Sequence, residues 1–224
     1  DPDRPIPRDE GIIVSPADGH VMFAKRERAT GRRPSNEEMA DAEQDDLTGT
    51  WHPEPCDEVL SFSTEQRFEA VPEGEESDDD VWRIAVFMSP LDVHVNRSPI
   101  AGKITRMEHR TGKGMRRGPF LPAFKKESEY NERVRTLFER EDGLLVEVMQ
   151  ISGALARTIV PWTSEGDTLR RGERFGMIRL GSRVDVRVPA NRFKPCVISA
   201  EDGDKEYPKG EFVQAGSTIL YKEL

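Results

Sequence analysis

Short apolar runs recur along this chain of 224 residues, and one of them, 184–188, alternates with polar residues at a period of two. Successive side chains of a β-strand point to opposite faces, so this period predicts strands with one face in the core. Predicted strands of this kind, or with a short continuous apolar run, are 11–14, 81–88, 144–149, 173–178 and 184–188. Gly, Pro, Asp or Ser bounds most of them, as is typical of turns.

One segment, 131–139, fits two structures. Its apolar residues Val134, Leu137 and Phe138 have the spacing of a helix face. The pair Asp142-Gly143 that follows is a strong hairpin signal, so we predict a strand that turns back into 144–149. The predicted fold class is therefore mainly β, α+β at most, with few short helices and with the tail 212–221 closing the sheet.

A short internal sequence repeat refines the predicted fold. Residues 15–21 and 98–104 share the frame Ser-Pro-x-x-Gly-x-aliphatic. Two such hairpins predict a pseudo-symmetric antiparallel β-sandwich or barrel, with hairpins like those of lipoyl-carrier domains.

Composition limits the domain count and the kinds of site. The length suits one domain, 1–224, and a net charge of −9 predicts an acidic surface, with the acidic run 73–80 solvated. Two isolated cysteines, Cys56 and Cys196, give neither a disulfide framework nor a metal-ligand spacing, so no metal site is expected. No apolar run is long enough to span a membrane.

Segment 103–140 reverses this charge balance, with eleven Lys or Arg against five Glu. One interpretation is a solvated basic face. The other is a loop that docks on an anionic membrane surface, with cations that attract lipid head groups and aromatic side chains that enter among them. The candidate residues are Arg116, Arg117, Phe120 and Phe124. Nucleic acid fits less well, because the chain is acidic and has no stripe of stacking aromatics.

The pair Gly181-Ser182 lies between two predicted strands and has two interpretations. A Gly-Ser pair is commonly a simple bend, because glycine adopts backbone angles closed to other residues. Alternatively, Ser182 is a nucleophile that attacks the carbonyl of Gly181 and cuts its own chain. The second interpretation needs a base close to the hydroxyl.

Six motifs, in order along nearly the whole chain, resemble those of phosphatidylserine decarboxylases. The resemblance is strongest to the short bacterial and archaeal type, whose archaeal members would act on archaetidylserine. The motifs are Ser-Pro-x-Asp-Gly at 15–19, Ser-Pro-Leu-Asp-Val-His at 89–94, Gly-Pro-Phe-Leu-Pro-Ala at 118–123, Asn-Glu-Arg at 131–133, Gly-Ala-Leu-Ala-Arg at 153–157 and Leu-Gly-Ser at 180–182. The proline-rich start also fits the family, which implies a hydrophobic anchor upstream and a location on the cytoplasmic side of the cell membrane.

The resemblance implies a mechanism and a prosthetic group. Cleavage at Gly181-Ser182 would give pieces 1–181 and 182–224, with Ser182 converted into a pyruvoyl group. That group would form a Schiff base with the amine of a serine phospholipid and act as the electron sink for decarboxylation. His94, oriented by Asp18, is the candidate base and proton donor. A pyridoxal-bearing lysine stays open on the sequence alone, although no lysine is marked for it.

One departure from the family concerns the base. Longer members carry a second His three residues after the first, where this chain has Arg97. His94 must therefore serve both cleavage and turnover, or another group must take one step.

Other functions remain as alternatives. One is a soluble pyruvoyl-dependent decarboxylase of a free amino acid, and another is a non-catalytic lipoyl-carrier-like module. A serine hydrolase is disfavoured, because no Gly-x-Ser-x-Gly elbow surrounds Ser182. A homodimer is one option for assembly.

Overall fold

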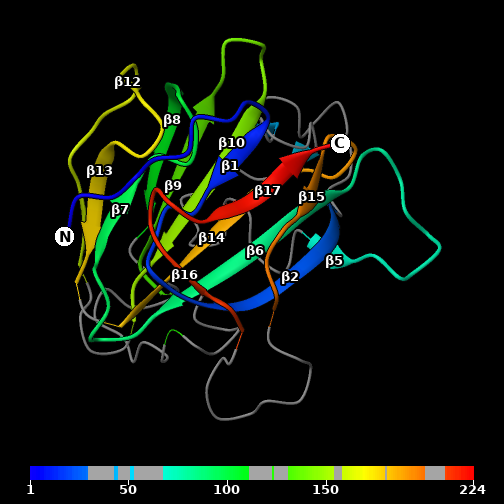
Figure 1. Ribbon diagram of the computed structural model, residues 1–224. Coiled ribbons are helices and arrows are strands. Elements are labelled where there is room, and N and C mark those ends of the chain that lie inside the picture. Colours follow the sequence, from blue (N-terminus) through cyan, green and yellow to red (C-terminus); the bar gives the residue numbers. More distant parts are fainter. Residues whose placement is uncertain are drawn as a thin grey trace.

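The computed structural model describes residues 1–29, 43–44, 51–52, 68–110, 123, 131–153, 158–179, 181–199 and 210–224. Within these residues the chain forms β-strands and no helix (Figure 1). This confirms the mainly β prediction. The strands are β1 (Ile12–Val14), β2 (Gly19–Ala29), β3 (Glu43–Gln44), β4 (Trp51–His52), β5 (Phe68–Ala70), β6 (Val81–Met88), β7 (Val95–Arg97), β8 (Gly102–Arg110), β9 (Arg133–Glu139), β10 (Leu145–Ile151), β11 (Ile159–Pro161), β12 (Thr168–Leu169), β13 (Arg174–Ile178), β14 (Ser182–Pro189), β15 (Phe193–Pro195), β16 (Phe212–Val213) and β17 (Ile219–Glu223).

A nine-stranded sheet forms the body of the molecule, in the order β12-β8-β9-β10-β14-β6-β2-β16, with β5 beside β2. Two three-stranded sheets, β1-β17-β15 and β11-β13-β7, accompany it, and β3 pairs with β4. The pairings are antiparallel in each of these sheets. The predicted hairpin of β9 and β10 is present, with Gly143 donating its N–H to the carbonyl of Arg140 at the turn.

The core lies between the large sheet and the two small sheets. Val184 and Val186 of β14 share one buried cluster with Ile13 of β1 and Phe175 of β13. The hydroxyl of Tyr221 donates to the carbonyl of Val186 at 2.8 Å, which ties β17 to β14. These contacts across the layers confirm the predicted antiparallel sandwich.

The other face of β14 is also buried, but it is charged. Arg183, Asp185 and Arg187 alternate with the core valines and are at most 2% exposed. Arg183 donates to both carboxylate oxygens of Asp185 at 2.6 Å, and Arg187 donates to Glu147 at 2.6 Å. Buried charges persist in proteins where they are paired in this way. The period of two therefore separates apolar from charge-paired layers, and neither face of this strand lies in solvent.

The internal sequence repeat corresponds to two equivalent turns. The Ser15 hydroxyl donates to the carbonyl of Ala17 at 2.6 Å, and the Ser98 hydroxyl donates to the carbonyl of Ile100 at 2.7 Å. Each serine thus makes the same bond two residues ahead, immediately before β2 in one case and β8 in the other.

Backbone hydrogen bonds join the two turns to each other. The N–H of Val14 donates to the carbonyl of Pro99, and the N–H of Arg97 donates to the carbonyl of Pro16. The two bonds connect matching positions of the two repeats in opposite directions. This reciprocal exchange is the geometry of a pseudo-two-fold axis, as the repeated frame predicts.

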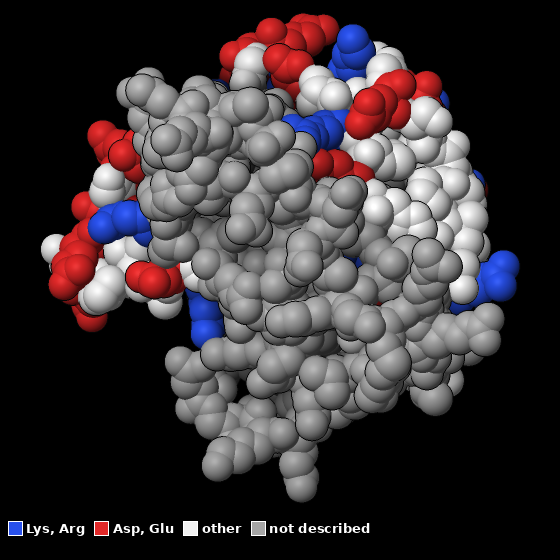
Figure 2. Space-filling model, turned by 180° about the vertical axis from the view of Figure 1, so that it is seen from behind, with Lys and Arg blue, Asp and Glu red and all other residues white. Residues whose placement is uncertain are grey.

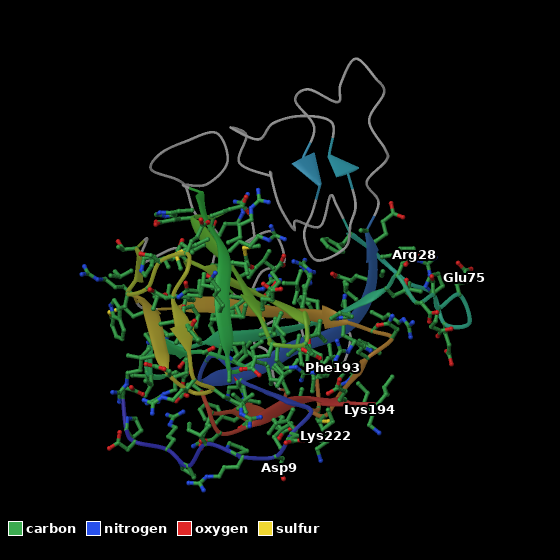
Figure 3. All side chains as sticks on the ribbon, turned by 90° about the horizontal axis from the view of Figure 1, so that it is seen from above. Asp9, Arg28, Glu75, Phe193, Lys194 and Lys222 are labelled. Carbon is green, nitrogen blue, oxygen red and sulfur yellow. The ribbon has the colours of Figure 1, made fainter. Side chains whose placement is uncertain are left out.

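The acidic loop before β6 departs from the prediction. Asp80, predicted to be solvated, is 1% exposed and accepts hydrogen bonds from Arg26 and Arg28 of β2. Burial by itself would raise the pKa of Asp80, but Arg28, the Ser77 N–H and Arg26 together lower it. Figure 3 shows Arg28 beside Glu75, whose carbonyl it also contacts. Other acids do gather at the margins of the described surface (Figure 2).

The tail 212–221, predicted to close the sheet, forms two strands joined by a turn. Residues 214–218 form a turn, with the N–H groups of Ser217 and Thr218 donating to the carbonyl of Gln214. The turn places β16 beside β2 in the large sheet and β17 between β1 and β15. The tail therefore closes two sheets.

Candidate active site

The Gly181-Ser182 bond lies at the entry to β14. Gly181 has a φ of 66°, in the left-handed region that favours glycine, and Ser182 opens the strand opposite Met88 of β6. Ser182 is completely buried, and its hydroxyl donates to the sulfur of Met88 at 3.3 Å. A thioether is a weak acceptor, so this bond holds the hydroxyl only loosely.

His94 lies against the same dipeptide. Its Nε2 accepts the Gly181 N–H at 3.0 Å, and its Nδ1 lies 2.7 Å from the carbonyl oxygen of Asp92. Because a carbonyl can only accept, Nδ1 carries the proton and Nε2 has the free electron pair. The ring is thus a neutral imidazole with its basic nitrogen at the candidate cleavage site. Here the structure brings together two of the predicted site residues, Ser182 and His94.

Asp18 has other partners. Its carboxylate accepts two hydrogen bonds from the Arg4 guanidinium, one of them at 2.6 Å, and a third from the Ala215 N–H at 2.8 Å. Asp18 as a whole is 4% exposed. Within the described part of the chain, no hydrogen bond joins Asp18 to His94. The carbonyl of Asp92 orients the ring instead, and a role for Asp18 in cleavage stays a prediction.

Gly153 presses against the carbonyl that the serine would attack. A Cβ atom at this position would lie 1.7 Å from the carbonyl oxygen of Gly181 and 2.9 Å from its carbonyl carbon. The pairing of Ile151 with Arg183 carries the chain to this contact. Only glycine fits here, and the position of the candidate scissile carbonyl depends on it.

A buried polar cluster lies close to Ser182. Gln150 donates to the Oδ1 of Asn96 at 2.8 Å, and the Asn96 amide in turn reaches the sulfur of Met88 at 3.9 Å. Two buried atoms of the neighbouring strand, the Oε1 of Gln150 and the hydroxyl of Ser152, have no hydrogen-bond partner. Each such group costs about 1–3 kcal/mol, so it calls for an explanation, of which a catalytic role is one.

Arg97, in place of the family's second His, ties down the start of the chain. Its guanidinium donates to the carbonyl of Gly172 at 2.9 Å and to the carboxylate of Asp1 at 2.9 Å. Burial, followed by repulsion from Arg174 and Arg4, lowers the pKa of Arg97. A hollow of about 880 Å³ beside Arg97, between residues 6–8 and 170–174, contains neither His94 nor Ser182 in its lining. Arg97 therefore has a structural role, since it links the start of the chain to Gly172.

The predicted membrane-binding residues Arg116, Arg117, Phe120 and Phe124 lie outside the described residues. Part of the basic segment that suggested them is described. Arg133 and Arg135 are at most 2% exposed, and Arg135 donates to Glu147 at 2.7 Å. These two cations belong to the charged layer of the sheet, so the local charge excess overstates the cations available to a membrane.

Sequence patterns alone did not single out Met88, Asp92 or Ser152. Met88 closes an apolar run, and the Asp92 carbonyl acts through its backbone. Ser152 could have been found from the antiparallel register, which sets the residue after Ile151 beside Ser182. That register becomes available only once β10 and β14 are known to pair.

Comparisons with known proteins identify the family. The family model described as phosphatidylserine decarboxylase matches residues 1–221. A phosphatidylserine decarboxylase proenzyme of Erythrobacter litoralis is 38% identical over 221 residues, which is 98% of this chain and 69% of that protein. Proenzymes of the same name from Thermobifida fusca and Streptomyces griseus are 49% and 54% identical over 63% and 48% of this chain, and these matches cover 57% and 46% of those proteins. No solved structure matches the chain.

The match extends over almost every described strand, and the Gly181-Ser182 pair with His94 lies inside it. This match over almost the whole chain, together with a relative 38% identical over 98% of it, shows that the chain belongs to the phosphatidylserine decarboxylase family.

Proposed function

We propose that this chain decarboxylates a serine-headed phospholipid to the ethanolamine lipid and CO2, after cutting itself between Gly181 and Ser182. The observation that carries the proposal is the contact of His94 with the Gly181 N–H, beside a buried serine. Family membership supports the reaction class. Phosphatidylserine and archaetidylserine are the two candidate substrates.

Cleavage would begin at the Ser182 hydroxyl. Its oxygen attacks the carbonyl carbon of Gly181, the C–N bond breaks, and the hydroxyl proton passes to the released nitrogen, which leaves an ester. Loss of the Ser182 α-proton then breaks the Cβ–O bond and frees Gly181 as a carboxylate. Water hydrolyses the remaining dehydroalanine, ammonia leaves, and a pyruvoyl group stays at position 182.

The surrounding residues have roles in this chemistry. Gly153 sets the position of the attacked carbonyl, and the unprotonated Nε2 of His94 is the nitrogen able to receive a proton. The weak bond to Met88 leaves the Ser182 hydroxyl free to turn toward the carbonyl.

The residues near position 182 fit a pyruvoyl group. Ser152 offers a hydroxyl donor without a partner, and Gln150 offers an acceptor without a partner, both buried. These two side chains, with Asn96, would hold the group and the polar head of the substrate. The pyruvoyl group supplies an electron sink for the carbanion that CO2 leaves behind. His94, whose Nε2 can carry a proton, would return that proton to carbon.

The test is CO2 release from carboxyl-labelled lipid by wild type and by Ser182→Ala. The variant should release none and should remain one chain of full length. Ser164→Ala, which alters an exposed serine, is the matched control and should cleave and react normally. Cleavage of Ser182→Ala into the same two pieces would end the proposal. Release of CO2 from a free amino acid but from neither lipid would favour the soluble decarboxylase.

We further propose that the enzyme works at the cytoplasmic side of the cell membrane, with Arg116, Arg117, Phe120 and Phe124 at the lipid surface. No helix among the described residues is long and apolar enough to cross a bilayer. Binding to vesicles with anionic lipid should weaken as salt rises, because mobile ions screen charges at the surface. Sedimentation with vesicles measures this, and binding that ignores salt would count against electrostatic docking.

A further inference from the structure

The loop between β6 and β7 carries a fully exposed leucine. Leu91 is 97% exposed, the highest value among the large exposed apolar side chains of the described residues. A single exposed leucine is common on protein surfaces and has no meaning by itself. The surroundings of Leu91, however, indicate a role for it.

The loop holds Leu91 in a fixed turn. The Ser89 N–H donates to the Asp92 carboxylate at 2.6 Å, and the Asp92 N–H donates back to the Ser89 carbonyl at 3.0 Å. The Leu91 N–H also reaches the Ser89 hydroxyl at 3.4 Å. A turn closed by its own hydrogen bonds loses little further entropy when its tip binds a partner.

The base of this turn belongs to the candidate active site. The Asp92 carbonyl orients His94, whose Nε2 accepts the Gly181 N–H. A Cβ atom at Gly181 would lie 3.7 Å from the Cγ of Pro90, the residue before Leu91. One short loop therefore joins the exposed leucine to the bond that would be cut.

The chemistry of a phospholipid substrate makes this juxtaposition meaningful. The serine head of such a lipid lies within a head-group layer about 5–8 Å thick, directly above the hydrocarbon core. A reactive group at position 182 can reach that head only if this end of the sheet meets the bilayer surface. The exposed Arg179, two residues before Gly181, adds a cation that suits anionic head groups at the same place.

We propose that Leu91 is a membrane anchor, which enters the apolar layer beneath the head groups and so brings the Gly181-Ser182 end of the sheet to its substrate. The occupant of this surface is the bilayer that contains the serine lipid. This inference rests on the proposed function and adds a docking residue to it.

Leu224 provides a matched control. It is also an exposed leucine, at 74%, and its N–H donates to the Arg192 carbonyl, beyond the other end of β14. Leu91→Ser and Leu224→Ser therefore remove the same apolar side chain from opposite ends of the molecule. Leu91→Trp replaces the anchor with a residue that prefers the membrane interface.

The experiment has two readouts. Sedimentation with vesicles of phosphatidylserine and phosphatidylcholine measures docking, and CO2 release from vesicles or from monomeric short-chain phosphatidylserine measures turnover. Leu91→Ser should bind vesicles about tenfold more weakly than wild type, because burying one leucine accounts for a factor of at least that size. Its rate should fall on vesicles and stay unchanged on the monomeric lipid. Leu91→Trp and Leu224→Ser should bind like wild type.

Two results would overturn the anchor. One is equal vesicle binding by Leu91→Ser and wild type, and the other is an equal loss of turnover on both forms of substrate, which would place Leu91 in the reaction site itself. Wild type that releases no CO2 from either form, nor from vesicles of archaetidylserine, would refute the proposed function instead. The vesicle-binding comparison would still decide the role of Leu91 in that case.

Discussion

The two ends of the nine-stranded sheet differ in how well their polar groups are satisfied. At the Ser182 end, the reactive hydroxyl donates to a thioether, the Ser152 hydroxyl has no partner and Leu91 is exposed. At the other end, Arg140 and Arg192 each donate to Asp142 at 2.7 Å and also reach Glu223. This four-residue ion-pair network joins the β9–β10 turn, the β14–β15 turn and β17.

This difference indicates that the Asp142 end stabilises the fold and that the Ser182 end carries the reactive groups. The ion-pair network fixes the ends of three elements. Its charged groups are paired with one another, so they are not available to bind a ligand. Loosely held and unpaired groups cost stability, and they are expected where a protein must bind or react. Changes at the Ser182 end should therefore alter cleavage, and changes at the Asp142 end should alter only stability.

The largest effect is expected from His94→Gln. Glutamine can keep a hydrogen bond to the Gly181 N–H but cannot move a proton, so cleavage should slow by about 10²–10⁴-fold. Gel analysis of cleavage against time measures this. His109→Gln is the control, because His109 is half exposed and contacts Glu132, and among the described residues no hydrogen bond joins it to Gly181 or Ser182. Cleavage of His94→Gln at the wild-type rate would remove His94 from the mechanism.

A smaller effect is expected from Gly153→Ala. The added methyl group meets the Gly181 carbonyl and must displace it, and a displacement of about 1 Å can cost roughly 10²-fold in rate. Gly102→Ala is the matched control, since its Cβ would lie 2.4 Å from the Glu139 carbonyl oxygen at the other end of the sheet. Both variants should lower the melting temperature, and only Gly153→Ala should slow cleavage. Equal cleavage rates for Gly153→Ala and Gly102→Ala would contradict the proposed difference between the two ends of the sheet.

The smallest effect is expected from Asp142→Asn. Arg140 first, and then Arg192, hold the pKa of Asp142 well below its ordinary value. A carboxyl whose pKa is depressed by folding stabilises the protein above its unfolded pKa of about 3.9, and that stability is lost as pH falls toward the folded value. Because Asp142 is exposed to solvent, the loss at pH 7 should be about 1 kcal/mol or less.

Denaturant unfolding at several pH values checks this last prediction. The difference between wild type and Asp142→Asn should be greatest above pH 5 and should shrink below about pH 4. Asp78→Asn, in the acidic loop, removes an exposed charge and should show a smaller difference. A change in the cleavage rate of Asp142→Asn would contradict the assignment of this end to stability alone.

Local patterns predicted much of the fold. Apolar runs located β6 and β13, and the period of two located β14. The Asp-Gly pair located the β9–β10 turn, and the Ser-Pro frame indicated the pseudo-two-fold turns. Each of these signals depends on residues close together in the chain. Asp80 was misjudged because its partners, Arg26 and Arg28, lie more than 50 residues away.

The site was predictable to the same extent. Ser182 and His94 stood in recognisable motifs, and the structure brings both to one dipeptide. The partners of Asp18 were not predictable, because Arg4 and Ala215 come from opposite ends of the chain. The contact of Gly153 with Gly181 depends on strand register, which no single motif contains.

The most direct test of the central claim is the intact mass of the purified wild-type protein. The account predicts two pieces, 1–181 with an ordinary carboxyl end and 182–224 with a pyruvoyl end. The second piece should gain the mass of the phenylhydrazine less one water on treatment with it, because only a ketone or aldehyde forms a hydrazone in this way. One uncut chain of 224 residues, or a second piece that begins with an unmodified serine, would contradict it.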